Sequence, residues 1–522
     1  MRHAGQQWTE DTRDEVIDQV VLGRRPSDLQ STMSTQSLFF IITLLLAVLL
    51  VNWIQPKESA MDVSQTRTIV IGGGLAGLSA AHTLIQHGAQ VLLLDKKPSL
   101  GGNSMKASSG INGAGTEAQK VLGVSDTVEA FAKDTTSSAG QLARPDLIHA
   151  LTSNSAESLS WLNSNFSIDL SLVSLLGGHS IARTHRGRGP PPGFAITSAL
   201  MKKLATLPAV EIIKSANVVR LLEANGRVSG VEYETNGETK TVEANAVIIA
   251  TGGYAADYAP AGLLAKYRPD LLGLPTTNGD HATGDGHRLA SSLHASLIDM
   301  DEIQVHPTGF VDPKDEGAKT KFLAAEALRG VGALLVDAEG KRFVDEMERR
   351  DNVTKAMQEI IEQGKGPIRL LLNADAEKEL KSHCDFYVSK GLMKKYDNAA
   401  DFARDTGVPN AALVQTLSEH NKYALGELKD PFGKVHFHNG QFNPDGTLLA
   451  AWVVPVVHYT MGGIRVDASA RVLSADGKAI PGLYAAGEVI GGVHGKNRLG
   501  GSSLLEAVVF GRLAGAAAVE AK

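Results

Sequence analysis

Apolar positions change their spacing several times just after residue 66. Residues 67–71 form a β-branched apolar run that ends in glycines, which is typical of a buried strand. In residues 75–87 the apolar positions recur at helical spacing, and Gly88 ends the pattern. Residues 91–94 are a second apolar run that ends at Asp95. The order of strand, glycine turn, helix and strand predicts a βαβ unit of the doubly wound α/β class.

Two late segments extend this sheet, because residues 246–250 and 482–486 are apolar runs followed by glycines. The stretch between them has a different pattern of apolar positions, which predicts a mixture of helices and strands. A capped helix is predicted over residues 351–362, a strand over 368–372, and a helix over 409–423, with Pro near its start where the missing N–H costs little. This mixture indicates an inserted domain and not a continuation of the parallel sheet.

We therefore predict an α/β fold with a doubly wound, Rossmann-like cofactor-binding domain and an inserted α+β capping domain. The first domain is predicted to comprise residues 66–303 and 458–522, and the capping domain residues 304–457. A length of 522 residues with 43% apolar side chains is ample for two such domains. Residues 1–64 stand apart as an N-terminal segment.

Within that N-terminal segment, residues 38–54 (LFFIITLLLAVLLVNWI) are nearly all apolar and carry no charge. Their length lies between a signal-peptide core and a membrane-spanning helix, so both a retained single-pass anchor and a cleaved signal are open. The polar residues before them include acidic side chains, which argues against a mitochondrial transit peptide. Met33 is an alternative start to Met1. We expect targeting to a membrane or the secretory pathway, with the endoplasmic reticulum or mitochondrion left open.

The net charge and the number of cysteines exclude several classes of partner and of redox site. The formal net charge is −6 and no Lys/Arg run occurs, so we expect no nucleic-acid partner. Cys384 is the only cysteine, which excludes an intrachain disulfide, a cysteine-ligated iron–sulfur cluster and a CxxCH haem site within this chain. We expect no metal site, and an external electron donor for any redox reaction.

The predicted turn at residues 72–77, Gly-Gly-Gly-Leu-Ala-Gly, fits the GxGxxG pattern of dinucleotide sites. Gly72 permits a tight turn, Gly74 lets a pyrophosphate approach the backbone, and Gly77 lets the helix pack closely on the sheet. Asp95 is placed to accept hydrogen bonds from the adenosine ribose. Two further glycine-rich segments, residues 250–253 and 486–492, favour FAD over NAD, since Glu488 directly after a strand can bind the ribityl hydroxyls.

Six further blocks carry a family resemblance. They are residues 101–112 (GGNSMKASSGIN), 304–308 (QVHPT), 326–330 (EALRG), 349–351 (RRD), 458–463 (HYTMGG) and 494–501 (HGKNRLGG). In this order, over nearly all of residues 66–520, the sequence resembles the flavoprotein subunits of the fumarate reductase and succinate dehydrogenase family. In detail it resembles the soluble, single-subunit type found in fungi.

The resemblance implies reduction of fumarate to succinate, with hydride transfer from flavin N5. It implies that Arg350 is the active-site acid and that Glu326 and Arg329 pass protons to it. Further members of the implied site bind the two substrate carboxylates (His306, His458 and Arg498) or support them (Gln304 and Thr308). The residue types agree, because a dianion in a dry cleft needs cations and donors, and guanidinium matches a carboxylate in two parallel hydrogen bonds. The capping domain would close over the cleft and expel water.

The cofactor contacts that follow from the glycine motifs and the resemblance form one larger set. They are Gly72, Gly74, Ala76, Gly77, Asp95, Gly102, Asn103, Ser104, Ser109, Gly110, Thr251, Gly252, Gly253, Glu488, Ser503 and Leu504.

Two positions depart from the family pattern. Asn103 stands where the respiratory relatives have the histidine that carries covalent FAD, so we expect FAD to be bound noncovalently. By family reasoning, this favours fumarate reduction over succinate oxidation. Ala325 replaces a threonine that contacts a substrate carboxylate in some bacterial relatives, which leaves the exact substrate less defined.

Other interpretations remain open at this level. A related flavoenzyme could reduce another unsaturated acid or oxidise aspartate, although no group that would bind the amine of aspartate is evident. A noncatalytic flavin protein is a different class, which the full set of site residues disfavours. A steroid substrate would need an apolar slot and not two carboxylate clamps. Without the resemblance, His306 could be a core histidine and Arg350 a surface ion-pairing residue.

Overall fold

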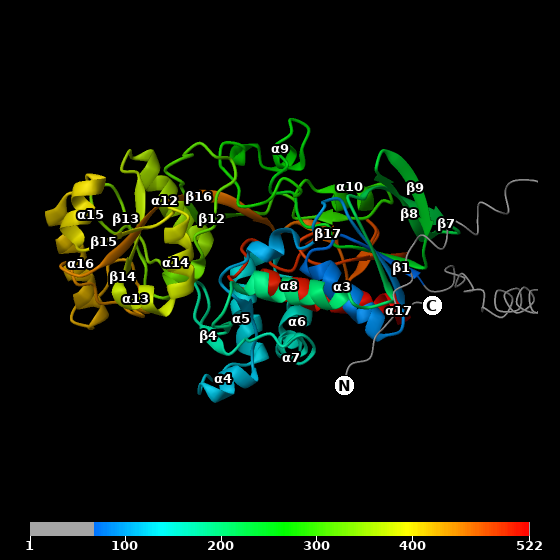
Figure 1. The fold of residues 1–522 in the computed structure, drawn as a ribbon, viewed down its shortest axis with the longest axis horizontal. Helices are drawn as coiled ribbons and strands as arrows, with labels where there is room; N and C mark the ends of the chain where they lie inside the picture. The colour runs from blue at the N-terminus through cyan, green and yellow to red at the C-terminus, as the bar shows by residue number, and fades with distance from the viewer. Residues whose placement is uncertain (1–66, 521–522) are drawn as a thin grey trace, which may run out of the picture. The chain divides into compact units, whose positions relative to one another are not determined.

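The computed structural model describes residues 67–520. The apolar segment 38–54 and the choice between Met1 and Met33 lie outside the described residues. The predicted α/β class, with a doubly wound domain and a capping domain, is confirmed by the two kinds of sheet described below. In Figure 1 the nucleotide-binding elements lie around α3 and β1, and the capping elements, in yellow and orange, lie on the opposite side.

The first sheet has six strands in the order β18-β19-β10-β1-β2-β6. All neighbours are parallel except β18 and β19. Continuous apolar runs such as those of β1 and β2 suit a sheet that is covered on both faces. The six strands are β1 (Arg67–Ile71), β2 (Gln90–Asp95), β6 (Val210–Lys214), β10 (Ala246–Ile249), β18 (Arg471–Leu473) and β19 (Ala479–Ala485).

Glycines set the geometry of the turn after β1. Gly72 has φ +106°, and a Cβ atom there would lie 2.3 Å from the carbonyl oxygen of Ala250. A Cβ at Gly77, in helix α3 (Leu75–Gln86), would lie 1.9 Å from the carbonyl oxygen of Gly72. Neither position can therefore hold a side chain without moving the backbone.

The last helix, α17 (Ser502–Glu520), packs along α3. Close approach is possible because Gly511 and Gly515 face the backbone of α3, where Cβ atoms would lie 2.5 Å from Ala76 O and 2.8 Å from Ala80 O. Among residues 67–520, α17 is the one helix long and apolar enough to cross a membrane, but 67% of it is buried inside the protein. We regard it as a core helix of the cofactor-binding domain.

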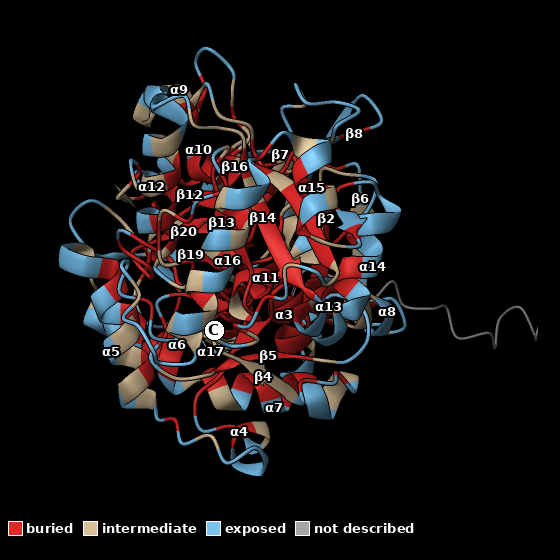
Figure 2. Cartoon of the chain, turned by 90° about the vertical axis from the view of Figure 1, so that its left-hand side faces the viewer, coloured by how far each residue is buried: buried red, intermediate tan, exposed pale blue. Residues whose placement is uncertain are grey.

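The capping segment is built on a second sheet, in which every pair of neighbouring strands is antiparallel. Its order is β12-β16-β14-β13, and β15 also pairs with β16. Figure 2 shows its strands β13 and β14 buried and its helices α15 and α16 partly exposed. The strands are β12 (Ile303–Phe310), β13 (Leu334–Val336), β14 (Ile368–Asn373), β15 (Lys394–Tyr396) and β16 (Leu448–Thr460).

The predicted capping elements lie close to their observed positions. Helix α12 runs over Arg350–Glu362 and helix α16 over Asn410–Ala424. The expected domain boundaries, 303/304 and 457/458, fall inside β12 and β16, because these two strands continue from the capping sheet toward the cofactor-binding domain.

The other elements complete both regions. The helices are α4 (Glu117–Val121), α5 (Val128–Ala139), α6 (Pro145–Ser153), α7 (Ser155–Phe166), α8 (Pro192–Leu204), α9 (Leu263–Tyr267), α10 (Asp285–Ser291), α11 (Glu326–Gly330), α13 (Ala374–Glu379), α14 (Lys381–Ser389) and α15 (Ala399–Thr406), with 3-10 turns η2 (Gly102–Lys106), η3 (Gly140–Leu142) and η4 (Pro269–Leu271). The strands are β3 (Ile111–Asn112), β4 (Leu172–Ser174), β5 (Thr184–Arg186), β7 (Asn217–Ala224), β8 (Arg227–Thr235), β9 (Glu238–Glu243), β11 (Leu297–Ile298), β17 (Gly463–Arg465) and β20 (Ile490–Gly491).

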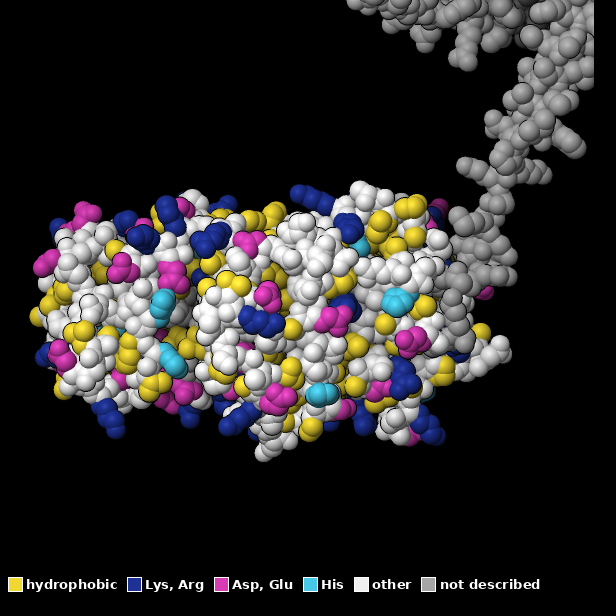
Figure 3. Space-filling view, turned by 90° about the horizontal axis from the view of Figure 1, so that it is seen from below, with side chains coloured by type: hydrophobic (Ala, Val, Ile, Leu, Met, Phe, Trp, Pro, Cys, Tyr) yellow, Lys and Arg dark blue, Asp and Glu magenta, His cyan; other side chains and the backbone are white. Residues whose placement is uncertain are grey.

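The surface carries charges of both signs. On the face shown in Figure 3, Lys and Arg side chains are interspersed with Asp and Glu side chains over the whole described region.

Candidate active site

A cavity of about 910 Å³ begins at the carboxyl ends of β1 and β2 and extends to the capping segment. Ligands bind at this edge of open parallel sheets, because the loops after the strands diverge there. The walls come from η2, the start of α8, the loop before α10, strand β16, helix α14 and the segment from Ala486 to Ala507. Segments far apart in the sequence thus share one cavity.

Most of the predicted cofactor contacts line this cavity. The fourteen that do so are Gly72, Gly74, Ala76, Asp95, Gly102, Asn103, Ser104, Ser109, Gly110, Thr251, Gly252, Glu488, Ser503 and Leu504. The other two, Gly77 and Gly253, lie behind the wall. A Cβ at Gly253 would lie 2.1 Å from Thr460 Oγ1 and 2.4 Å from Glu488 Oε1, so this glycine gives room to the groups that face the cavity.

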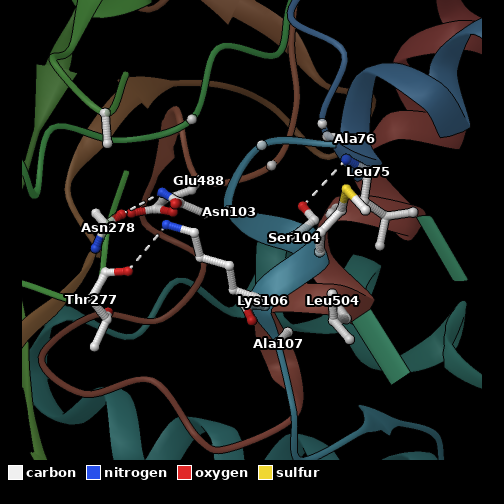
Figure 4. A pocket seen from close by; sticks show the side chains of 18 of the residues that line it. Leu75, Ala76, Asn103, Ser104, Lys106, Ala107, Thr277, Asn278, Glu488 and Leu504 are labelled. Carbon is white, nitrogen blue, oxygen red and sulfur yellow. Dashed lines mark hydrogen bonds between the residues drawn. The ribbon is translucent and has the colours of Figure 1, made fainter. Parts of the chain in front are cut away.

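The N-terminus of α3 is open to the cavity. Its N-cap, Gly74, contributes no side chain, and the nearest atom to a Cβ there would be Ser104 Oγ at 3.8 Å. Ser104 Oγ accepts a hydrogen bond from the N–H of Leu75 at 3.3 Å (Figure 4). The first turn of a 12-residue helix presents unpaired N–H groups and partial positive charge, which suits a pyrophosphate.

Two carboxylates fit the other polar parts of a dinucleotide. Asp95 is oriented by the N–H groups of Gly73 at 2.7 Å and Lys97 at 2.8 Å, which leaves acceptor sites for ribose hydroxyls. Glu488 accepts from the Thr460 N–H at 3.1 Å. Burial raises the pKa of Glu488 to about 7, although the Thr460 N–H and Arg498 act in the opposite direction. Near neutral pH this carboxyl can therefore accept or donate a hydrogen bond to a polyol chain.

Asn103 lies in a polar group that also lines the cavity (Figure 4). Its Nδ2 donates to Asn278 Oδ1 at 2.5 Å, and its Oδ1 accepts from the Gly279 N–H at 3.0 Å. Lys106 Nζ donates to the carbonyl oxygen of Thr277 at 3.4 Å. An amide is not a nucleophile, and both ends of this one are engaged. Lys106, Thr277 and Asn278 were not predicted. Thr277 and Asn278 lie in a loop outside the quoted blocks, and Lys106 lies inside the block 101–112 but was not assigned a role.

Cationic and imidazole groups meet at the capping side of the same cavity. Arg350, His458 and Arg498 all line it. His306 is fully buried directly behind, with its ring centroid 5.1 Å from that of His458. The residues come from the start of α12, from β16, from β12 and from the loop before α17. Folding therefore brings together the three residues that the resemblance assigned to the substrate carboxylates and the arginine that it assigned as the acid.

Arg350 is held by two partners. Its Nε donates to Glu326 Oε2 at 2.7 Å, and its Nη2 donates to the same oxygen. Its Nη1 donates to Gln304 Oε1 at 2.7 Å, and Gln304 in turn donates to the carbonyl oxygen of Arg498 at 2.7 Å. Burial acts to raise the pKa of Glu326, but the charges of Arg350 and Arg329 outweigh it and lower that pKa to about 2. Glu326 is therefore ionised at neutral pH.

Arg329 lies one step further from the cavity. Its Nη2 is 3.6 Å from Glu326 Oε1, and its Nη1 donates to the carbonyl oxygen of Glu346 at 2.6 Å. Burial lowers the pKa of Arg329, and the nearby Arg350 acts in the same direction against the attraction of Glu326. Arg350, Glu326 and Arg329 therefore form a buried row of alternating charge.

Both histidines are neutral hydrogen-bonding groups. Burial lowers the pKa of His306 and of His458 well below 6.5, and neighbouring arginines lower it further. His306 Nδ1 accepts from the Thr308 N–H at 3.1 Å, which assigns its proton to Nε2. That Nε2 has no partner among the described residues. His458 Nδ1 is 2.7 Å from Thr277 Oγ1.

Thr308 and Ala325 lie beside these groups. The Thr308 hydroxyl donates to the carbonyl oxygen of Ala324 at 3.1 Å, so its side chain supports the strand behind His306. Ala325 is fully buried and is the N-cap of α11, with no side chain to cap that helix.

Arg498 differs from Arg350, because no carboxylate within residues 67–520 forms an ion pair with it. Its Nη1 donates to the carbonyl oxygen of Leu499 at 3.3 Å, and its Nε has no partner in this part of the chain. Burial lowers the pKa of Arg498 to about 10, and Arg350 contributes to the shift. A buried guanidinium and a buried imidazole with unpaired donors beside one cavity provide the chemistry that an anion needs.

Comparison with known proteins agrees with this geometry. The sequence profile of the FAD binding domain family matches residues 67–504. A fumarate reductase of Schizosaccharomyces pombe is 48% identical over 461 residues, which cover 87% of this chain and 89% of that protein. Fumarate reductase 1 of Saccharomyces cerevisiae is 45% identical over 466 residues, covering 87% of this chain and 98% of that protein. The open conformation of a flavocytochrome c3 fumarate reductase superposes with a TM-score of 0.69 at 31% identity, covering 96% of this chain and 85% of that one.

Proposed function

The chain belongs to the FAD-binding flavoprotein family that contains these fumarate reductases, and we propose that it is an FAD-dependent oxidoreductase that reduces fumarate to succinate. The observation that carries the proposal is the group formed by Arg350, Arg498, His306 and His458 at one end of the cavity that the predicted FAD contacts line. Cofactor and dianion chemistry thus meet in one place.

In the proposed reaction the chain first binds and orients the substrate. Arg498 and the two neutral histidines would donate hydrogen bonds to the two carboxylates. Arg498 Nε and His306 Nε2 are buried donors that no acceptor within residues 67–520 occupies. Holding both ends of a short diacid can turn one carboxylate out of the alkene plane and polarise the double bond. Bound FAD would supply the hydride, from its N5, to one alkene carbon.

Arg350 would deliver the proton to the other alkene carbon. Arginine is a weak acid, so the residue needs a partner that restores its proton after the transfer. Arg498 and Arg329 place positive charge nearby, and Glu326 bonds directly to the guanidinium and can exchange a proton with it. The buried row Arg350, Glu326 and Arg329 gives a short route for restoring that proton.

Electrons would come from an external carrier such as a reduced flavin, because the chain's single cysteine excludes a cysteine-ligated cluster within it. We also propose that residues 38–54 anchor the whole protein in a membrane.

Anaerobic reoxidation tests the proposal. The purified holoprotein is reduced with dithionite, and the flavin spectrum is followed after fumarate is added; we expect rapid reoxidation. Arg350→Ala should lower this rate by about two to four orders of magnitude, the range for loss of a general acid, while FAD remains bound. Arg349→Ala is the matched control, because Arg349 pairs with Asp351 at 2.8 Å at the half-exposed surface. Reoxidation by fumarate that is unchanged in Arg350→Ala would refute the assigned mechanism.

A second candidate substrate is another unsaturated acid. Ala325 favours it, because this side chain offers no hydroxyl to the second carboxylate of fumarate. Rates with fumarate, urocanate, methacrylate and aspartate compare the classes directly. A rate with another unsaturated acid that exceeds the rate with fumarate would reassign the substrate.

A further inference from the structure

The two arginines of the site are held in different ways. Arg350 is bonded to the carboxylate of Glu326, whereas Arg498 has no carboxylate partner within residues 67–520. An arginine that must bind a substrate carboxylate benefits from this, since a protein carboxylate would occupy the same in-plane donors. A long side chain without such a partner still has to be oriented, and its mobility would cost conformational entropy on binding.

Tyr459 supplies that orientation through the face of its ring. The Arg498 guanidinium carbon lies 4.4 Å from the centroid of the Tyr459 ring. A guanidinium over an aromatic face is attracted to the ring, and its N–H groups remain free to bond in the guanidinium plane. Tyr459 lies on β16 immediately after His458 and is 5% exposed.

The Tyr459 ring is itself fixed by two buried groups. Its hydroxyl donates to Glu506 Oε2, and His494 Nε2 lies 3.0 Å from the same oxygen. Glu506 lies on α17 and is 1% exposed, and His494 is 2% exposed. Burial raises the pKa of Tyr459 well above 10, and Glu506 acts in the same direction, so the hydroxyl stays a donor. The ring centroids of Tyr459 and His494 are 5.8 Å apart, so these two residues also contact each other.

We propose that Tyr459, Glu506 and His494 are positioning residues that aim the Arg498 guanidinium into the cavity without neutralising its charge. They belong to β16, α17 and the loop between β20 and α17, so the group also couples the capping strand to the last helix. The inference rests on the proposed function, because it requires Arg498 to bind a substrate carboxylate. Glu506 bonds to the Tyr459 hydroxyl and forms no ion pair with Arg498, so within residues 67–520 it does not occupy the donors of that arginine.

Equilibrium binding of a nonreactive dicarboxylate tests this role. Malonate is titrated into the oxidised holoenzyme, and the change in the flavin absorbance gives its Kd. Tyr459→Leu removes the ring face, and we expect its Kd to rise about tenfold, the effect of a desolvated cation–π contact and a disordered ligand side chain. Tyr459→Phe keeps the face but loses the hydroxyl, and Glu506→Gln keeps the shape and an acceptor oxygen but loses the negative charge. Both should show a smaller rise, of about threefold.

A double-mutant cycle separates positioning from general support. If Tyr459 acts through Arg498, then Tyr459→Leu should change the malonate Kd by less than about twofold when Arg498 is already Ala. Tyr484→Phe is the matched control, because Tyr484 is 2% exposed and its hydroxyl donates to the carbonyl oxygen of Ala517 at 3.1 Å, away from Arg498. We expect this control to bind malonate as the unchanged protein does.

Two outcomes would overturn the inference. One is an equal effect of Tyr459→Leu with and without Arg498, since the residue would then support the fold alone. The other is an unchanged Kd in Tyr459→Leu that retains FAD. Should Tyr459→Leu not fold, the same cycle with Arg498→Ala is measured with Tyr459→Phe and with Glu506→Gln, and the same criterion applies. If the unchanged protein neither binds malonate nor reduces fumarate, the proposed function fails instead.

Discussion

At the scale of single residues, Glu326 links stability to the site. Its pKa is lowered from 4.5 to about 2 in the folded protein, because Arg350 and Arg329 outweigh the cost of burial. A carboxyl with a depressed folded pKa stabilises the protein above its unfolded pKa, and this contribution is lost as the pH falls through the folded pKa. The relevant window is therefore between about pH 4.5 and pH 2.

We expect Glu326→Gln to lower the free energy of unfolding at pH 7 by about 3 kcal/mol, because two buried guanidinium groups lose their counter-charge. The difference from the unchanged protein should shrink as the pH falls below about 4.5. Urea unfolding at several pH values measures it. Asp351→Asn is the control, since the pair of Asp351 and Arg349 is half-exposed and should contribute less than about 1 kcal/mol. A difference that does not depend on pH would contradict the ionised state of Glu326.

Sequence analysis named candidate site residues from motifs, but not every motif residue that lies at the site was named. Gln304, His306, Glu326, Arg350 and His458 were named from blocks that folding brings into contact.

Residues that act through a partner far along the chain were not identified. Tyr459 stands inside a recognised block, but its contact with Glu506 exists only once β16 and α17 lie together. The sequence contains no pattern for such a contact, so the positioning group could be found only in the structure.

At the scale of elements, the turn between β1 and α3 is the most constrained. We expect Gly77→Ala to lose FAD and to be destabilised, because the new methyl group would lie 1.9 Å from the carbonyl oxygen of Gly72. The strand and helix would have to separate, which costs about 1–3 kcal/mol in a well-packed interior. Flavin absorbance per protein and thermal unfolding measure both effects. Gly317→Ala, where a Cβ meets nothing within 4 Å, should change neither. Full FAD content in Gly77→Ala would contradict this account of the turn.

Long apolar strands of the parallel sheet were predictable, since burial on both faces leaves continuous apolar runs. The three-stranded antiparallel sheet β7-β8-β9 was not predicted, although a signal was present. Its strands are joined by Asn225-Gly226 and by Asn236-Gly237, and all four residues have positive φ. Asn-Gly pairs of this kind are typical of two-residue hairpin turns. The alternating, half-exposed strands beside them resemble loop sequence and obscured the signal.

At the scale of the whole molecule, residues 38–54 carry the prediction of a retained membrane anchor or a cleaved signal. If this segment is a retained anchor, the full-length protein should remain with the membrane pellet after a carbonate wash, because an apolar segment that spans the bilayer is not extracted. Immunoblotting of the pellet and supernatant measures this. A variant with two Asp residues placed in the middle of the segment is the control and should be released. Recovery of the unchanged full-length protein in the supernatant would rule out the anchor.

The pairing of α3 with α17 has a consequence for biosynthesis. The glycine turn is among the first described parts of the chain to leave the ribosome, and Ser503 and Leu504, which complete the cavity wall, are among the last. A nascent chain therefore exposes the apolar faces of β1 and α3 throughout translation of the capping segment, with neither flavin nor partner helix to cover them. We therefore expect FAD to bind fully only after α17 has been synthesised, because the cavity wall is incomplete until then.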